Sequence, residues 1–160
     1  MTESKSKSLE EPTGSFQGGL AQLIDLSLVT ITEQEVVGEL VVSPKHYQPM
    51  GIVHGGVYCA MVETVCSVGA FVHASKRGRT VVGVDNQTSF LKATRTGTLR
   101  AVGRPLSIGG RTQLWEANIV NQEGVLVATG RVRLVALDVG SQLAGQKLEA
   151  PAGSANEPSR

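Results

Sequence analysis

The sequence contains few of the residues that mark specialised chemistry. Its 160 residues include two cysteines, three histidines and one tryptophan, and aromatic residues make up only 4% of the chain. The three histidines, His46, His54 and His73, do not form a metal-ligand set with the two cysteines. We therefore expect no metal ion and no redox cofactor.

Neither sign of charge is in large excess. Fifteen basic and fourteen acidic side chains leave a net charge of +1, with the histidines counted as neutral. This balance argues against a nucleic-acid-binding protein, because such proteins carry a strong basic excess. A hydrophobic content of 41% in a chain of this length is typical of one globular domain with a proper core.

Both cysteines, Cys59 and Cys66, fall within one apolar stretch, seven residues apart. That spacing does not place two metal ligands on adjacent helical turns, and nothing nearby in the sequence would activate either thiol as a nucleophile. We expect packing thiols in a reducing compartment. The first fifteen residues are polar and charged and show no secretory signal, so we expect a cytoplasmic location.

The longest apolar stretch begins at Val57 and predicts a helix with hydrophobic residues on almost every face. Such a helix is either buried on all sides or spans a membrane. One carboxylate, Glu63, lies in its middle, and no lysine or arginine occurs between Gln48 and Ser75. Because a charge near the centre of a bilayer is unfavourable, and because the rest of the chain has strand patterns, we expect a buried core helix.

The remaining chain has the pattern of a single α+β domain with a tail at each end. Residues 1–15 predict a disordered tail, residues 16–138 the domain, and residues 139–160 a flexible tail. A short helix is expected over 16–26 and a strand over 29–42. A curved antiparallel β-sheet wrapped around one long buried helix would explain why that helix has no polar face. The other four expected strands cover residues 80–91, 99–106, 112–120 and 125–137.

The start of the long helix and the acid in its middle together suggest a reactive site. His54-Gly55-Gly56 opens the helix with backbone N–H groups that lack partners within it, and the helix dipole favours negative charge there. Ser67 lies one turn after Glu63, on the same face. A buried carboxylate without a local cation must find hydrogen-bond partners or take up a proton.

These residues and their spacing resemble the hotdog-fold acyl-CoA thioesterases. The shared pattern is His54-Gly55-Gly56, with Gln48 six residues before the histidine, Glu63 nine residues after it, and Ser67 four residues further on. The greatest similarity is to the Arthrobacter-type 4-hydroxybenzoyl-CoA thioesterase group, which is related to the menaquinone-pathway (1,4-dihydroxy-2-naphthoyl-CoA) and enterobactin-pathway thioesterases. The resemblance covers residues 36–137 and implies a hotdog fold and hydrolysis of an acyl-CoA.

The resemblance implies a role for each residue of the pattern. Glu63 attacks the thioester carbon directly, giving a mixed anhydride, or activates a water molecule. Gly55 offers its N–H to the developing oxyanion, and Gln48 donates its amide to the thioester or to the acyl group. Ser67 holds the hydrolytic water, and His54 orients Gln48 or the loop. Each residue also has a purely structural alternative, such as packing, a tight turn or a backbone hydrogen bond.

The same resemblance implies where the substrate binds. Lys92 and Arg111 are expected to contact the CoA phosphates and Thr112 to add a hydroxyl, with a solvated basic rim as the alternative. Asn86 and Ser89 are expected in the acyl pocket, whose polarity favours a small, aromatic, hydroxybenzoyl-type group over a long chain. CoA is part of the substrate, so no separate cofactor is expected.

The distance between two of the predicted catalytic groups indicates that the protein acts as an oligomer. Gly55 and Glu63 are eight residues apart, which is about 12 Å along a helix. One copy is therefore not expected to place both on the same carbonyl group, whereas an antiparallel second copy can. We expect a homodimer with shared sites, and the resemblance implies a homotetramer. Two alternatives stay open: an enoyl-thioester hydratase or dehydratase of the same fold, and a non-catalytic acyl-CoA-binding module.

Overall fold

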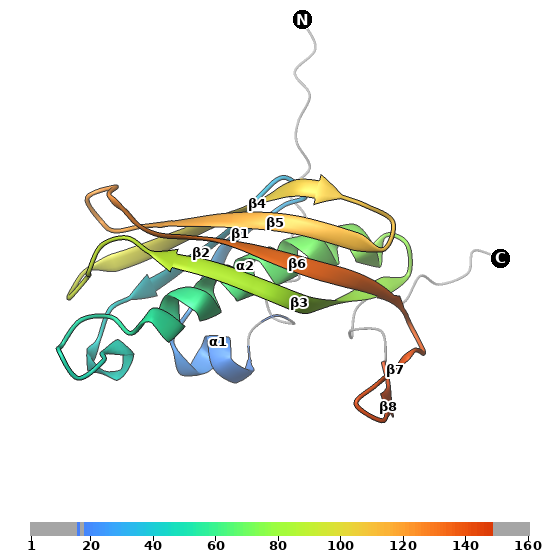
Figure 1. Cartoon of the computed structure of the whole chain (residues 1–160), viewed down its shortest axis with the longest axis horizontal. Helices are drawn as coiled ribbons and strands as arrows, with labels where there is room; N and C mark the ends of the chain where they lie inside the picture. The colour runs from blue at the N-terminus through green and yellow to red at the C-terminus, as the bar shows by residue number, and fades with distance from the viewer. Residues whose placement is uncertain (1–15, 17, 149–160) are drawn as a thin grey trace, which may run out of the picture.

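The computed structural model of the chain describes residue 16 and residues 18–148, and Figure 1 shows the order of their helices and strands. The helical segments are α1 (Gly19–Leu23), the short 3-10 helix η2 (Pro44–His46) and α2 (Gly55–Ser75). The strands are β1 (Ser27–Ile31), β2 (Val36–Val41), β3 (Arg79–Phe90), β4 (Thr98–Ile108), β5 (Thr112–Val120), β6 (Leu126–Asp138), β7 (Gln142–Leu143) and β8 (Gln146–Lys147).

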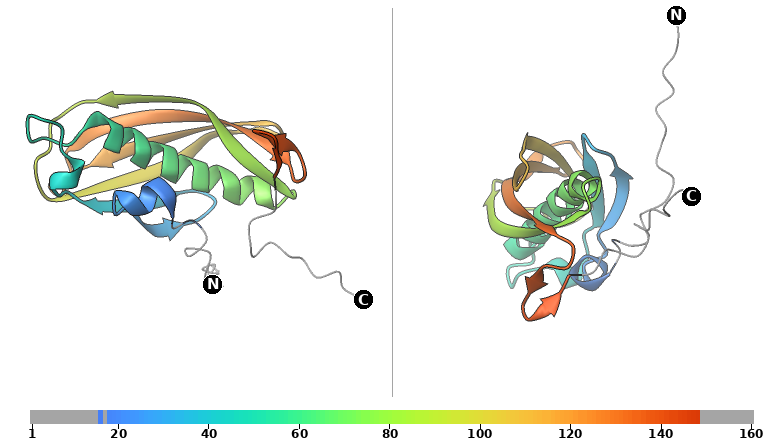
Figure 2. Two further views of the ribbon diagram at one scale, coloured as in Figure 1. Left: turned by 90° about the horizontal axis from the view of Figure 1, so that it is seen from below. Right: turned by 90° about the vertical axis from the view of Figure 1, so that its right-hand side faces the viewer.

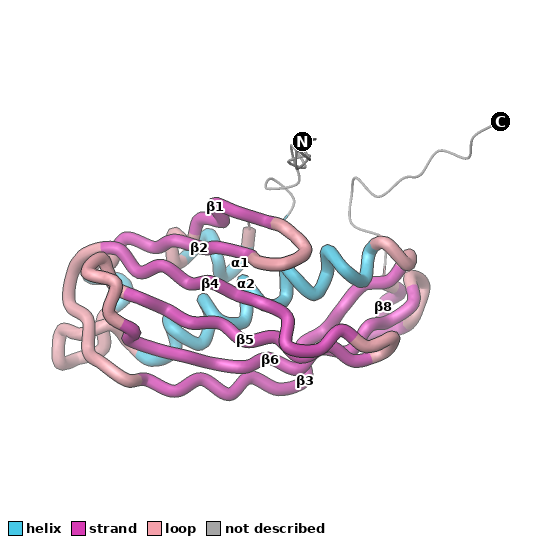
Figure 3. Tube along the Cα trace, turned by 90° about the horizontal axis from the view of Figure 1, so that it is seen from above, coloured by secondary structure: helices cyan, strands magenta, loops and turns pink. Residues whose placement is uncertain are grey.

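Six strands form one antiparallel sheet in the order β1-β2-β4-β5-β6-β3, which Figure 3 shows across the whole molecule. β3 follows α2 in the chain but pairs with β6, from Arg79 opposite Asp138 to Phe90 opposite Ala128. β3 and β1 are therefore the two edges of the sheet. An edge strand presents unpaired backbone N–H and C=O groups on its outer side.

The sheet curves around α2, as the end-on view in Figure 2 shows. The side of the helix that faces the sheet is apolar and includes Met61, Val62, Val65 and Cys66, all with 0% exposure. Only ten of its 21 residues are buried within a single chain. The sequence predicted that the helix is buried on all sides. Within a single chain one side of the helix is buried, and the face that carries Glu63 is half buried.

Two glycines allow α2 and the sheet to approach closely. A Cβ atom on Gly69 of the helix would lie 2.3 Å from the ring of Trp115 on β5. A Cβ atom on Gly103 of β4 would lie 3.0 Å from the side chain of Val65. Small residues at these contacts let large side chains fill the layer between helix and sheet at the density of a protein interior.

The expected α+β hotdog architecture, a curved antiparallel sheet around one long helix, is confirmed. By length and composition alone α2 could also cross a membrane, but half of its apolar window is buried inside the protein. The sheet thus covers much of the surface that a bilayer would otherwise have to solvate.

The strand expected over 29–42 is divided into two strands, β1 and β2. The turn between them is held by Thr32, whose hydroxyl donates to the carbonyl of Glu35 and accepts from the Glu35 N–H, both at 2.9 Å. Thr32-Glu33-Gln34-Glu35 contains no glycine or proline, so the usual signal of a hairpin is missing. The short helix expected over 16–26 is also shorter in the structure, where only Gly19–Leu23 is helical.

The two tails are described only in part. Residues 1–15 and 149–160, which complete the predicted tails, lie outside the described residues. Within the predicted C-terminal tail, β7 and β8 pair as a short hairpin, with Gln142 opposite Lys147.

The contact between Gly69 and Trp115 yields a stability prediction. We expect Gly69→Ala to lower the free energy of unfolding by about 1–3 kcal/mol, because overpacking against a rigid indole outweighs the higher helix propensity of alanine. Urea unfolding followed by the fluorescence of Trp115, the one tryptophan in the chain, measures this. As a control, Gly110→Ala should change stability by less than about 0.5 kcal/mol, because nothing lies within 4 Å of a Cβ there. Equal stabilities for the two variants would contradict the packing argument.

Candidate active site

Glu63 lies on the half-buried face of α2, held by two neutral hydrogen-bond donors. The Ser67 hydroxyl donates to its Oε1 at 3.2 Å, and the Asn86 side-chain amide donates to its Oε2 at 2.8 Å. Among residue 16 and residues 18–148, no lysine, arginine or histidine pairs with this carboxylate. The acid is therefore oriented without being neutralised by a cation.

A β-bulge in β3 shapes the strand around Glu63. The pairing of β3 with β6 is irregular between Gly83 and Asp85, so Gly83 and Asn86 both face α2 although they are three positions apart. Without a bulge, this spacing would put them on opposite faces of the sheet. A Cβ atom on Gly83 would lie 2.3 Å from Oε1 of Glu63. The strand thus leaves a slot for the carboxylate and places a donor beside it.

His54 caps the first turn of α2. Its Nδ1 accepts the N–H of Gly56 at 2.8 Å, which satisfies one of the free N–H groups at the start of the helix. The N–H of Gly55 donates to no acceptor within the described part of the chain. The positive end of the helix dipole therefore offers one free donor at Gly55, where an oxyanion would be stabilised.

A cavity of about 220 Å³ adjoins this helix start. The ring of Phe90 lies directly on Gly55, where a Cβ atom would be 2.4 Å from Cε2. The Tyr58 ring is 5.9 Å from the Phe90 ring, and its buried hydroxyl has no hydrogen-bond partner among residue 16 and residues 18–148. The sequence analysis gave neither Tyr58 nor Phe90 a role in the site, although Tyr58 follows Gly55 by one helical turn. The lining residues are Gln48, Ile52, Val53, Gly55, Tyr58, Phe90, Leu91, Lys92 and Ala93.

Gln48 lies in a tight turn at the rim of this cavity. Its backbone N–H donates to the Ile52 carbonyl at 2.9 Å, and its Oε1 accepts the Met50 N–H at 3.1 Å. Gly51 completes the turn with a positive φ of 70°, which glycine adopts without strain. The Nε2 of Gln48 donates to no acceptor among the residues that the structure describes, so it is available to a ligand.

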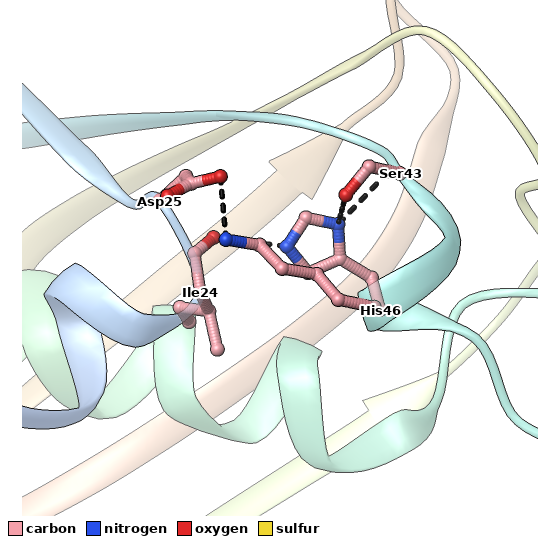
Figure 4. Close-up of polar contacts among 5 residues, drawn as sticks. Ile24, Asp25, Ser43 and His46 are labelled. Atoms are coloured by element: carbon pink, nitrogen blue, oxygen red, sulfur yellow. Dashed lines mark hydrogen bonds and ion pairs between the residues drawn. The ribbon is translucent and has the colours of Figure 1, made fainter.

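His46, shown in Figure 4, anchors the loop that carries Gln48. The side chain is 1% exposed, and its Nδ1 accepts the Ser43 N–H at 2.9 Å. The ring hydrogen is therefore on Nε2, which donates to the Ile24 carbonyl at 3.0 Å. The His46 carbonyl accepts the His54 N–H at 2.8 Å. One buried histidine thus ties the corner before β1 to the start of α2.

Ser89 does not lie with Asn86, contrary to the expectation that both line the acyl pocket. Ser89 is paired with Thr129, whose hydroxyl donates to Asn118 on the outer face of the sheet. Asn86 is paired with the buried Val132 and faces the helix. The two residues are three apart on a regular stretch of strand, so they point to opposite faces. The Asn86 amide itself contacts Glu63.

The predicted phosphate contacts lie at opposite ends of one chain. Lys92 lies beside the start of α2, whereas Arg111 and Thr112 lie at the turn between β4 and β5, near the end of α2. A helix of 21 residues is about 30 Å long, so these residues form no single cluster within one protomer. A second cavity of about 230 Å³ lies at the far end, lined in part by Arg77, Arg79 and Gly110.

Neither cysteine has the surroundings of a nucleophile. Cys66 is fully buried, and burial raises the pKa of its thiol, with the carboxylates of Glu63 and Glu116 raising it further. Cys59 is half buried and forms no disulfide within the described residues. Within residue 16 and residues 18–148, no group of three His, Cys, Asp or Glu side chains is arranged to hold a metal ion.

Comparisons with known proteins identify similar sequences and similar folds. Residues 50–128 match the model of the thioesterase superfamily. Rv1847 of Mycobacterium tuberculosis, a protein named as an esterase, is 42% identical over 102 residues, covering 62% of this chain and 73% of that protein. The 1,4-dihydroxy-2-naphthoyl-CoA hydrolase of Escherichia coli is 26% identical over 124 residues, covering 78% and 90%. The structure of thioesterase HI1161 from Haemophilus influenzae has a TM-score of 0.76 at 26% identity, covering 84% and 93%.

The surroundings of Cys66 predict an unreactive thiol. In Cys59→Ser protein at pH 8, we expect an aromatic disulfide reagent to release no chromophore from the native state, because the raised pKa keeps Cys66 protonated and burial blocks access. After addition of denaturant, one equivalent should react. Rapid reaction of the native variant would contradict the buried, protonated thiol.

Proposed function

The chain belongs to the thioesterase superfamily and is a thioester hydrolase, and from that premise we propose that it hydrolyses a small, aromatic acyl-CoA. The products are the free acid and coenzyme A. The observation that carries this proposal is Glu63, a half-buried carboxylate held by Ser67 and Asn86, with no cation paired to it among the described residues. We further propose that the chain is of the Arthrobacter 4-hydroxybenzoyl-CoA thioesterase type, on the motif that begins at His54.

The proposed reaction uses the Glu63 carboxylate and the hydrogen-bond donors near the start of α2. Glu63 removes a proton from a water molecule as the water oxygen bonds to the thioester carbon, or its own oxygen bonds to that carbon first. The free N–H of Gly55 and the amide of Gln48 stabilise the negative charge that develops on the carbonyl oxygen. The C–S bond then breaks, and coenzyme A leaves as a thiolate that takes up a proton. On the direct route, water then hydrolyses the mixed anhydride, which releases the free acid and regenerates the Glu63 carboxylate.

Two copies of the chain would complete each site. Gly55 and Glu63 are about 12 Å apart along one helix, too far for one carbonyl group. The edge strand β3 exposes the apolar side chains Val84 (55%) and Phe90 (54%), which favours pairing with a second β3. Gly83, beside Glu63, and Phe90, on Gly55, are about 23 Å apart along the strand. Antiparallel pairing about the midpoint would bring one copy's Gly83 beside the other's Phe90, and hence Glu63 near Gly55.

The aromatic walls of the cavity support an aryl acyl group. Tyr58 and Phe90 present flat apolar surfaces that suit a planar ring, and Gln48 supplies a polar contact. The Escherichia coli relative is named for an aromatic acyl-CoA. Lys92 of one copy and Arg111 and Thr112 of the other are the candidates for the CoA phosphates. The free thiols support a cytoplasmic location, and we propose a dimer of dimers on the family resemblance.

Removal of the carboxylate should abolish turnover. We expect the wild type to release free thiol from benzoyl-CoA or hydroxybenzoyl-CoA, and Glu63→Gln to lower kcat by at least about 100-fold, because the amide is neither base nor nucleophile. Glu123→Gln, in an exposed turn, is the matched control. Near-normal turnover by Glu63→Gln would contradict the role of the acid. With an enoyl-CoA as the substrate, loss of enoyl absorbance without thiol release would indicate a hydratase. Neither signal with any of these substrates would indicate a binding module.

The shared site predicts recovery of activity between two inactive variants. Gly55→Pro removes the backbone N–H. Proline suits the first position of a helix, and the preceding His54 already has the extended conformation that a following proline favours. Gly55→Ala adds the same Cβ against Phe90 while keeping the N–H, so the difference between the two variants measures the donor. Refolding Gly55→Pro together with Glu63→Gln should restore about a quarter of wild-type activity, because half of the dimers carry one intact site. No recovery in verified mixed dimers would overturn the shared geometry.

A further inference from the structure

Asn86 is held in a single orientation by its neighbours. Its Nδ2 donates to Oε2 of Glu63 at 2.8 Å and lies 3.3 Å from the carbonyl oxygen of Cys59. Its Oδ1 accepts the hydroxyl of Thr88 at 2.7 Å. A rotated amide would turn its oxygen toward the Glu63 carboxylate and the Cys59 carbonyl, which are both acceptors, and its NH₂ group toward Thr88. The contacts therefore fix which end of the amide meets the acid.

Thr88 is itself fixed by the sheet. It pairs with Gly130 of β6, and a Cβ atom on Gly130 would lie 2.7 Å from the Thr88 hydroxyl oxygen. The absent side chain of Gly130 thus leaves the space that the hydroxyl occupies. Thr88 is half buried and faces the helix, on the same side of β3 as Asn86.

We propose that Thr88 and Asn86 form a hydrogen-bond relay that positions the Glu63 carboxylate for catalysis. Thr88 orients Asn86, and Asn86 holds Oε2 of Glu63, while Ser67 contacts Oε1. This inference rests on the proposed function, in which the Glu63 carboxylate is the catalytic base or nucleophile. Both Thr88 and Asn86 are positioning residues in this proposal, and Asn86 takes this role in place of the acyl-pocket role expected from the sequence.

The chemistry of the relay suits a reactive carboxylate. A neutral amide donor orients an anion but leaves its charge uncompensated, whereas a lysine or arginine at the same place would form an ion pair. Each carboxylate oxygen has two lone pairs, so one donor on each oxygen leaves sites for water or for attack on carbon. The bulge after Gly83 is what turns Asn86 and Thr88 to the helix side together with Gly83.

Substitutions of Thr88 test the relay without removing a group that touches the acid. We expect Thr88→Val, which keeps the shape, to lower kcat about 10- to 100-fold with KM within about twofold, because Asn86 loses its orienting donor. Thr88→Ser should restore kcat to within about threefold of the wild type, because it restores the hydroxyl. Thr129→Val is the matched control, since its hydroxyl donates to Asn118 at 2.7 Å on the opposite face. It should leave kcat unchanged.

A pH profile distinguishes positioning from packing. Cys59 and Cys66 are the titratable neighbours of Glu63 on α2, and Asp85 of β3 faces away from it, opposite Arg133. Asn86→Asp places a second carboxylate beside Glu63, so we expect the acidic limb of the kcat profile to move upward by about one pH unit or more. Melting temperature and elution volume of each variant verify fold and assembly.

Three results would overturn the relay. These are wild-type kinetics for Thr88→Val, failure of Thr88→Ser to rescue a folded protein, and an unmoved pH profile for Asn86→Asp. If Glu63→Gln is inactive and any of these occurs, the relay alone fails. If Glu63→Gln is fully active, the proposed function fails first and the relay with it.

Discussion

The structure depends on one half-buried carboxylate that is solvated by neutral hydrogen-bond donors and forms no ion pair within the described part of the chain. Taking the charge of Glu63 partly out of water costs free energy unless donors replace the lost water. α2 supplies Ser67 and β3 supplies Asn86. Because neither donor is charged, they orient the carboxylate without forming an ion pair with it, whereas an arginine would have formed one. The shape of strand β3 meets this need for hydrogen-bond donors around Glu63.

The edge strand β3 serves both the acid and the assembly. Its bulge and Gly83 make room for Glu63, and its inner face also carries Phe90, which covers Gly55. Its outer side is left unpaired by the strand order of the sheet. An acid in the middle of α2 and a free N–H at its start are too far apart to act on one carbonyl group. The same strand that positions the acid is therefore the natural place for a second copy to complete the site.

Much of the fold could be predicted from local patterns in the sequence. The apolar run after His54 indicated α2, and alternation between turns placed β5 with its observed bounds, Thr112–Val120. The β1–β2 hairpin was missed because its turn is made by the Thr32 hydroxyl and not by glycine or proline. Asn86 and Ser89 were predicted to lie together, but side-chain alternation along β3 puts them on opposite faces of the strand. Phe90 carried no local signal, since only folding brings it onto Gly55.

By itself, the sequence determined the long apolar helix, the spacing from His54 to Glu63 and Ser67, and the family to which the chain belongs. These are properties of residues close together in the chain, where periodicity and spacing act directly. Only the tertiary structure decided that Asn86 and Thr88 hold Glu63, and that Tyr58 and Phe90 frame the helix start. The contacts of Asn86 with Glu63 and of Tyr58 with Phe90 join residues more than twenty positions apart. They depend on strand register and on one bulge, which no local pattern encodes.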